Sequence, residues 1–305
     1  MRVTFLGTSA GMPTIERSLP AVVLTTTNWR EALLFDCGEG TQVRLRQSGI
    51  KPGKLSRIFI SHLHADHVTG LLGLLLTLQM LGRDTPLYLY GPPGLRRYLE
   101  TSRSLLQSGW AYPTPVQEMS EAGLVVEGPG YTVTCDLLEH GVPTLGYRVR
   151  EADRPGTLDA DRAVELGVPK GPLMGVLQSG EPVTTATGRV VRPEEVLGPT
   201  RPGRRVAYCT DTRPCPADLR LAQDVDLLIH EGTFASNMAE DAARKGHSTV
   251  TEAARVARDA GARRLAITHV SPRYSDPELL RAEAAEVFPN TTVVSDLQVL
   301  ELPAR

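Results

Sequence analysis

Residues 61–67 read Ser61-His62-Leu63-His64-Ala65-Asp66-His67 and place three of the chain's seven histidines within six positions. An apolar run at residues 57–61 comes before them and an apolar stretch at residues 68–81 follows, so we expect a strand, a tight turn and a buried helix. His62 and His64 are two positions apart on extended backbone, so their side chains point to the same side. Grouped imidazole and carboxylate donors suit Zn²⁺ or a similar metal, because burying them without one would leave them poorly satisfied.

More donors follow predicted strands elsewhere in the chain. His140 comes after a strand expected at residues 131–139, Asp211 after one at 206–209, and His269 after one at 265–268. Taken singly, each is an ordinary polar residue at the surface. Their repeated position at strand ends favours a metal site that they share with residues 62–67.

The rest of the chain predicts an α/β fold. Further strands are expected at residues 2–6, 21–25, 32–36, 86–90, 124–127, 145–150 and 227–230, with closing strands at 293–294 and 297–302. Helices are expected at residues 95–107, after the capping-box pattern Thr249-Val250-Thr251-Glu252, and from Pro277 onward. Residues 151–203 carry a weak core signal and only a short helical patch at 160–166, so we interpret them as a protruding insertion.

Composition limits the class of protein. The chain has 305 residues and a net charge of −2, so no bulk attraction to nucleic acid follows, and such a partner would need a local basic surface. Its four cysteines are scattered without a C-x-x-C pair, which favours reduced thiols in the cytoplasm. No signal-peptide layout opens the chain, and its longest apolar stretch is too short to span a bilayer. We therefore expect a soluble protein with no membrane partner.

The H-x-H-x-D-H pattern at residues 62–67, with later His, Asp and His at strand ends, resembles the metallo-β-lactamase superfamily. Within it, the chain is most similar to the short-form ribonuclease Z family of tRNA 3′-end processing endonucleases. The segments that carry this resemblance are Phe5-Leu6-Gly7-Thr8-Ser9-Ala10-Gly11, Phe35-Asp36-Cys37-Gly38-Glu39-Gly40, His140-Gly141-Val142-Pro143, His230-Glu231-Gly232-Thr233-Phe234 and His247-Ser248-Thr249. The resemblance extends from residue 1 to about residue 274.

The resemblance implies a four-layer αββα sandwich, formed by one domain over residues 1–305 with a flexible substrate-binding arm inserted at about 151–203. It also implies two zinc ions per subunit, with manganese or iron left open as the natural metal. The resemblance assigns His62, His64 and His140 to one ion, Asp66, His67 and His269 to the other, and Asp211 to both. It places Asp36 and Thr8 as hydrogen-bonding supports of the loops around the metals.

For catalysis, the resemblance implies attack on phosphorus by a metal-activated hydroxide, with Asp66 as general base. His247 would donate a proton to the leaving oxygen while Glu231 holds its imidazole. Glu231 could instead be a buried carboxylate with no catalytic part, and the role of His230 stays open.

The implied substrate is precursor tRNA, whose 3′ trailer would be removed to leave a 3′-hydroxyl, and the implied assembly is a homodimer. Residues 167–180 resemble the Gly-Pro-rich tip with which the family's arm grips tRNA. Two departures weaken phosphate contact by this arm. Gln178 stands where the family usually has lysine, and residues 151–180 carry five acids against three bases. The alternative is a small-molecule phosphodiesterase or other hydrolase of the same fold; a non-hydrolytic electron-transfer member is disfavoured because no histidine of residues 62–67 is replaced by a carboxylate.

Overall fold

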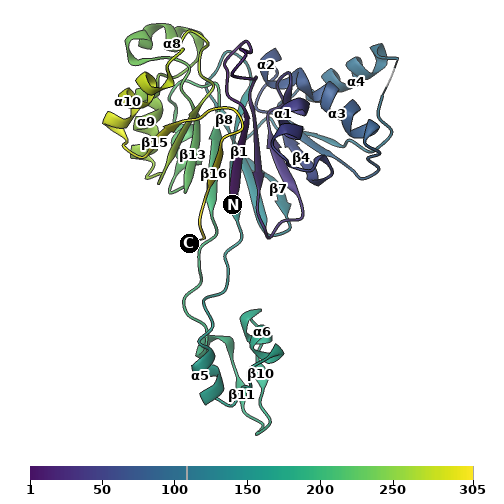
Figure 1. Ribbon diagram of the computed structural model, residues 1–305, viewed down its shortest axis with the longest axis vertical. Coiled ribbons are helices and arrows are strands. Elements are labelled where there is room, and N and C mark those ends of the chain that lie inside the picture. Colours follow the sequence, from purple (N-terminus) through teal and green to yellow (C-terminus); the bar gives the residue numbers. More distant parts are fainter. Residues whose placement is uncertain (108, 305) are drawn as a thin grey trace. The chain divides into compact units, whose positions relative to one another are not determined.

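The computed structural model describes residues 1–107 and 109–304, and two seven-stranded sheets dominate it (Figure 1). The first sheet has the order β16-β1-β2-β3-β4-β5-β6 and the second the order β15-β14-β13-β12-β9-β8-β7. The strands of the first sheet are β1 (Arg2–Gly7), β2 (Ala21–Thr25), β3 (Ala32–Phe35), β4 (Leu55–Phe59), β5 (Tyr88–Gly91), β6 (Val116–Glu118) and β16 (Val299–Glu301). Those of the second are β7 (Gly123–Gly128), β8 (Tyr131–Leu138), β9 (Thr144–Glu151), β12 (Arg205–Cys209), β13 (Leu227–Glu231), β14 (Leu265–Thr268) and β15 (Thr291–Val293). Residues 1–150 and 205–303 form this unit.

The main core lies between the two sheets. Strand β1 contributes Val3 and Phe5 to it from one face, as the two-residue period of a strand requires. The rings of Phe35 and Phe59 stack 4.9 Å apart, and Tyr147 from the other sheet packs edge-on to Phe59 at 5.5 Å. These aromatic contacts join the sheets below the ends of β3 and β4.

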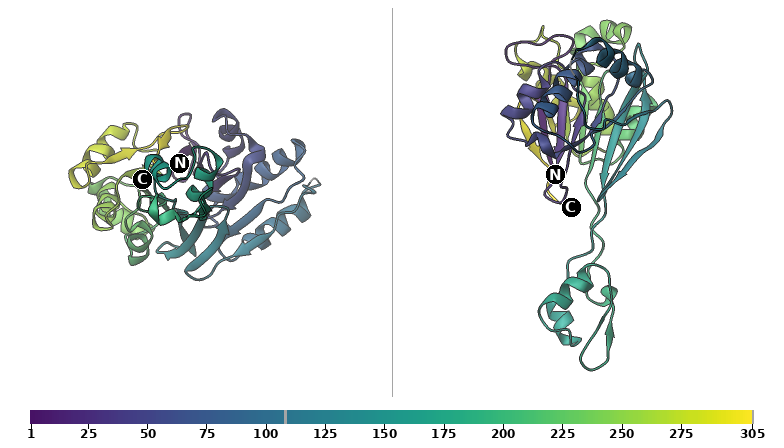
Figure 2. Two further views of the ribbon diagram at one scale, coloured as in Figure 1. Left: turned by 90° about the horizontal axis from the view of Figure 1, so that it is seen from below. Right: turned by 90° about the vertical axis from the view of Figure 1, so that its right-hand side faces the viewer.

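Helices cover the outer face of each sheet, which gives the four-layer αββα sandwich that the sequence predicts (Figures 1 and 2). The first sheet is covered by α1 (Thr41–Gln47), α2 (Ala65–Val68), α3 (Gly70–Met80) and α4 (Leu95–Leu105). The second is covered by α7 (Pro216–Ala222), α9 (Val250–Asp259) and α10 (Pro277–Val287), and α8 (Ala239–Lys245) precedes α9. At the start of α9 the capping box is formed, because the Thr249 hydroxyl accepts from the Glu252 backbone N–H and Glu252 accepts in return.

The helix expected at residues 68–81 is divided in the structure. α2 ends at Val68 and α3 begins at Gly70, where an added Cβ would lie 1.9 Å from the carbonyl oxygen of Gly38. This close approach of the Gly38 loop needs glycine, and the Gly70 N–H donates to the Cys37 carbonyl oxygen at 3.0 Å instead of to a carbonyl of α2, which interrupts the helix. Helices α1, α7 and α8 were not anticipated, since each has only seven residues and its apolar pattern is short.

Residues 151–204 belong to a second unit with secondary structure of its own. It contains α5 (Ala160–Glu165), α6 (Pro172–Gln178) and a hairpin of β10 (Val183–Thr184) and β11 (Val190–Val191). A small apolar cluster includes Ala163, Leu177 and Val191. At the base of the unit the buried side chains of Arg204 and Glu151 pair at 2.7 Å. The weak core signal of this segment thus corresponds to a small core rather than to an unstructured loop.

Within the described residues, no helix is both long and apolar enough to cross a bilayer. The four cysteines all lie in the described part of the chain, where they are free and buried.

Candidate metal centre and catalytic site

The candidate site residues lie where strands of both sheets end. In the second sheet β12, β13 and β14 run parallel, so Asp211, Glu231 and His269 arrive at one edge. In the first sheet the parallel pair β3 and β4 ends just before Asp36 and His62. The carboxyl ends of parallel strands meet at the same edge of a sheet, which is why residues so far apart in sequence converge here.

The first donor group consists of His62, His64, His140 and Asp211. Nδ1 of His64 lies 3.0 Å from Nε2 of His62 and 3.2 Å from Nε2 of His140. Oδ2 of Asp211 is 3.6 Å from the His62 nitrogen and 3.8 Å from the His140 nitrogen. Four donor atoms thus surround one small space.

The second donor group consists of Asp66, His67 and His269. Nε2 of His67 lies 3.3 Å from Nε2 of His269, and Oδ2 of Asp66 is 3.5 Å from the first and 3.4 Å from the second. Oδ1 of Asp211 completes the group at 3.3 Å from His67 and 3.2 Å from His269. The two oxygens of Asp211 therefore face different groups, as expected of a bridging carboxylate.

These distances match a tetrahedral metal site. A metal–nitrogen distance of ~2.1 Å places neighbouring ligand atoms about 3.4 Å apart, in the middle of the 3.0–3.8 Å range observed here. Hydrogen bonds between the imidazoles do not explain all of these contacts, because His140 and His67 use their outer nitrogen as the donor. Nδ1 of His140 is 2.7 Å from the Gly246 carbonyl oxygen, and Nδ1 of His67 is 2.8 Å from Asp36. The inward nitrogens then present lone pairs to one another, an arrangement that suits a cation between them.

Asp36 is the most connected support of the site. Its Oδ2 accepts from His67, from the Ser61 hydroxyl at 2.8 Å and from the Tyr208 hydroxyl at 2.7 Å, while Oδ1 accepts from the Ser61 N–H at 2.7 Å. Thr8, the other expected support, donates its hydroxyl to Asp296 at 2.8 Å and accepts at its carbonyl oxygen from the N–H of Val270, next to His269, at 2.9 Å. Ser61 and Tyr208 were not identified from sequence. The position of Ser61 next to His62 was the only sequence signal for it, and Tyr208 carried none.

Three residues at the site have left-handed backbone. Asp36 has φ of 56°, Asp211 of 27° and His269 of 55°, and each is the first or second residue after a strand. Side-chain-bearing residues adopt this region at a cost and remain there only when their surroundings hold them. The turns that aim these donors at one another are therefore held by the tertiary structure.

Burial and neighbouring charges shift the pKa values of the site residues in different directions. Burial, together with the neighbouring His67, lowers the pKa of His62 to about 2, and burial also lowers the pKa of His140. For Asp211 burial opposes ionisation, but His269 and His67 outweigh it and lower the pKa well below its usual value. The pKa of His67 is raised because Asp211 and Asp36 outweigh its burial. The carboxylates thus attract positive charge, which a divalent cation supplies at the same lone pairs.

A hydrogen-bonded pair, His247 and Glu231, lies next to the two donor groups. Nδ1 of His247 lies 2.9 Å from Oε1 of the fully buried Glu231. Glu231 also accepts from the Thr212 N–H at 2.7 Å and the Thr233 hydroxyl at 2.6 Å, so its position is fixed. Burial would lower the pKa of His247, but Glu231 outweighs it and raises that pKa to about 9. His247 is therefore a positively charged imidazole that is hydrogen-bonded to the carboxylate of Glu231, whose position is fixed.

The opening above these groups is a cavity of about 310 Å³. Besides the donors, its wall includes Phe234, Lys245 and Arg273. The Lys245 ammonium lies 5.5 Å from the centroid of the Phe234 ring, and the Arg273 guanidinium lies 5.0 Å from it. The rim of the cavity is thus cationic, which suits a phosphate-bearing substrate.

All nine residues that the sequence suggested for the site lie together around this cavity or directly beneath it. His230 lies outside it. Its Nδ1 is 2.8 Å from the Glu231 carbonyl oxygen, and its Nε2 is 3.8 Å from Asp218 in the interior. The sequence left the role of His230 open, and the structure places its side chain in the interior and not among the donor groups.

Comparisons with known proteins agree with this arrangement. Residues 177–270 match the family described as beta-lactamase superfamily domain, and residues 1–114 match the family described as anti-Pycsar protein Apyc1. A ribonuclease Z of Gloeothece citriformis is 47% identical over 99% of this chain and 96% of its own. A ribonuclease BN of Cronobacter sakazakii is 48% identical over 97% of this chain and 98% of its own. The short form of human tRNase Z has a TM-score of 0.73 at 28% identity and covers 99% of this chain and all of its own.

Two sheets sandwiched between helices, with His and Asp donors gathered at their shared edge, define a protein of the metallo-β-lactamase fold. Nearly half of its residues are identical to those of the ribonucleases Z and BN over almost the whole length of both chains. The chain belongs to the ribonuclease Z family.

Proposed function

We propose that this chain removes the 3′ trailer from precursor tRNA by hydrolysing one phosphodiester bond. The oxygen of water would bond to phosphorus, and the bond from phosphorus to the 3′ oxygen of the tRNA would break. The tRNA then keeps a 3′-hydroxyl and the trailer carries the phosphate. The observation that carries this proposal is the pair His247–Glu231, which faces two donor groups joined by Asp211 in a chain of this family.

Zinc is the proposed metal, with two ions per chain. His62, His64 and His140 would hold one ion, Asp66, His67 and His269 the other, and Asp211 both. Nitrogen-rich donor sets of this kind suit zinc, although manganese and iron also bind imidazole and carboxylate. Two such ions neutralise charge that develops on a phosphodiester and lower the pKa of nearby water.

The chain's own residues would orient the reactants and move the protons. Asp66 faces the cavity with Oδ2, which accepts from the Gly11 N–H at 2.9 Å, and we assign to it the orientation of the attacking water. His247 would donate its proton to the departing 3′ oxygen. Glu231 would hold the imidazole in the required tautomer, as its 2.9 Å contact with Nδ1 leaves Nε2 to face the substrate.

We further propose that residues 151–203 act as the substrate-binding arm and that the active form is a cytoplasmic homodimer in which one subunit's arm serves its partner's site. The separate small core of this segment supports an arm that folds as a unit. The free, buried cysteines support a reducing compartment.

The decisive experiment gives the purified full-length, zinc-loaded chain two substrates, a precursor tRNA transcript and bis-p-nitrophenyl phosphate. We expect cleavage of the transcript at one position, with a 3′-hydroxyl that a periodate oxidation assay identifies. The matched variant His247→Ala should lose cleavage of the transcript while it retains its metal. Hydrolysis of the small diester alone, with the transcript left intact, would instead establish a small-molecule phosphodiesterase.

A further inference from the structure

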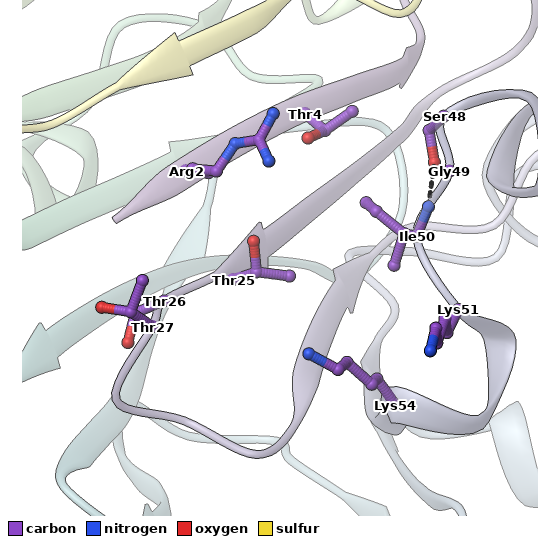
Figure 3. Close-up of a pocket in the computed structure, with 10 residues that line it drawn as sticks. All are labelled: Arg2, Thr4, Thr25, Thr26, Thr27, Ser48, Gly49, Ile50, Lys51 and Lys54. Carbon is purple, nitrogen blue, oxygen red and sulfur yellow. Dashed lines mark hydrogen bonds between the residues drawn. The ribbon is translucent and has the colours of Figure 1, made fainter.

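A second cavity, of about 370 Å³, lies beside the start of β1 and the end of β2. Its wall consists of Arg2, Thr4, Thr25, Thr26, Thr27, Ser48, Gly49, Ile50, Lys51 and Lys54 (Figure 3). The strands contribute Arg2, Thr4 and Thr25, the turn after β2 contributes the other two threonines, and the segment after α1 contributes the lysines. Its volume falls within the range of ~300–1,000 Å³ that small-molecule sites occupy.

The sheet is unusually polar at this cavity. On β1, Val3 and Phe5 point to the core between the sheets, so Arg2 and Thr4 lie on the outer face that helices cover elsewhere. Thr4 is only 4% exposed, and its hydroxyl has no hydrogen-bond partner among the described residues. The hydroxyl is therefore available to a ligand in the cavity.

Positive charge gathers around the same space. Lys51 and Lys54 are two of only four lysines in the chain, and neither has a carboxylate partner in the part of the chain that the structure describes. Figure 3 shows Lys54 extending its ammonium toward the strands from the side opposite Arg2. Arg2 has one exposed partner, Glu301 at 3.3 Å. Three cations against one carboxylate leave the cavity with an excess of positive charge.

We propose that this cavity binds a phosphoryl group, carried by a small nucleotide or by the backbone of an RNA. Lys51 and Lys54 would neutralise the phosphate as flexible point charges, Arg2 would add a planar donor pair, and the Thr4 and Thr25 hydroxyls would complete the hydrogen bonding. The threonine hydroxyls can donate to phosphate oxygens from the floor of the cavity.

The cavity is separate from the metal centre. Arg2 begins β1, whereas the donors lie beyond the other end of that strand, after Gly7. Five strand steps of ~3.3 Å put more than 15 Å between the two sites. The proposal therefore does not rest on the reaction assigned to the metal centre.

The first test measures the binding of ADP to the full-length, zinc-loaded protein by isothermal titration calorimetry. Any component of ADP binding that changes in His247→Ala belongs to the metal centre. That substitution lies outside the cavity and should leave the affinity of the cavity for ADP unchanged. Lys51→Ala combined with Lys54→Ala should weaken the cavity component at least tenfold, and Thr4→Val should weaken it several-fold. Lys170→Ala, which removes a lysine from the second unit, is the matched control for this measurement and should leave the ADP affinity of the cavity unchanged.

The second test identifies the source of the phosphate. If RNA is the ligand, the double lysine variant should lower the slope of log affinity for precursor tRNA against log salt by about 1.5, because each lost phosphate contact removes ~0.7–0.9. If a free nucleotide is the ligand, that slope should stay unchanged while the ADP affinity falls. ADP binding that is absent or unaffected by the double variant, with an unchanged salt slope, would overturn the proposal whatever the protein does to tRNA.

Discussion

The Nδ1 atom of His247 lies 2.9 Å from Oε1 of Glu231, and three elements distant in sequence hold the pair in place. Glu231 ends β13, His247 precedes α9, and the Thr212 N–H that bonds Glu231 follows β12. The carboxylate is fully buried, whereas the imidazole reaches the cavity of the metal centre. In this arrangement the buried carboxylate of Glu231 orients the more exposed imidazole of His247. Such an arrangement is suited to proton transfer by the imidazole.

Replacing Glu231 with Gln should lower kcat for precursor tRNA about 10²-fold or more, since general acid–base catalysis contributes ~10²–10⁴. The amide keeps the size of the side chain but no longer fixes the charge or tautomer of His247. Metal content, measured by atomic emission, should stay at the wild-type ratio, because the hydrogen bonds of the Glu231 carboxylate go to His247, Thr212 and Thr233 and to none of the residues of the first and second donor groups. A variant with full kcat would make Glu231 a buried structural carboxylate.

Removing the metal should abolish cleavage and lower the thermal unfolding temperature by several degrees. Without a cation, the lone pairs of His62, His64 and His140 face one another in a largely buried space. Dialysis against a chelator, followed by calorimetry and by titration with zinc, measures both effects. Two equivalents of zinc should restore activity; full activity in a metal-free sample is incompatible with the site.

Asp36→Asn should weaken metal binding about 10–100-fold, as loss of a partner of a metal-binding histidine commonly does. The amide cannot accept from His67, Ser61 and Tyr208 as the carboxylate does. A competitive chelator titration gives the affinity. Asp296→Asn is a useful control, because Asp296 is also a partly buried carboxylate but bonds Thr8 and Ser18 rather than a donor histidine.

Deleting residues 155–195 and closing the gap with a short glycine linker should abolish cleavage of precursor tRNA but leave hydrolysis of a small phosphodiester nearly unchanged. The segment has its own apolar cluster, so its removal leaves the main core intact. The two rates and the metal content report the outcome. An equal loss on both substrates would show that the segment does not act on the RNA.

A finer test of the same segment is Gln178→Lys. Gln178 ends α6 and is exposed, so the added charge meets no burial cost. If this helix lies against phosphates, the salt slope of precursor tRNA binding should steepen by ~0.7–0.9. Gln178→Glu should have the opposite effect on affinity, and equal affinities for both variants would place the helix away from the RNA.

The pair His230–Asp218 should contribute to stability in a pH-dependent way. Burial opposes protonation of His230, but Asp218 at 3.8 Å and the Glu231 carbonyl raise its pKa above the unfolded value of ~6.5. A raised pKa in the folded state gives stabilisation that is complete below pH ~6.5 and is lost as the pH rises through the folded pKa. The difference in the free energy of unfolding between wild type and His230→Gln, from urea titrations, should be about 3 kcal/mol at pH 6, because the variant leaves the buried Asp218 carboxylate with the Cys215 N–H but without a cationic partner. That difference should shrink toward pH 9, and a constant difference would contradict the assignment.

The donor types and their positions after strands could be predicted from the sequence alone, because the H-x-H-x-D-H pattern, the capping box at Thr249 and the two-residue period of the strands are local. Local patterns also predicted most strands and the insertion at residues 151–203. They did not separate α2 from α3, since that break depends on the hydrogen bond from the Gly70 N–H to the Cys37 carbonyl oxygen, 33 positions earlier in the chain.

Only the tertiary structure decided how the donors meet. The left-handed turns at Asp36, Asp211 and His269 are set by packing and not by local preference, because most side chains disfavour that backbone. The Tyr208 hydroxyl bonds Asp36, which lies 172 positions earlier in the chain. The basic cavity between β1 and the segment after α1 brings together residues whose spacing in the sequence does not predict a binding site. The sequence determined which atoms can bind a metal. The packing of the two sheets around one core determined that these atoms lie close enough together to bind the same metal ions.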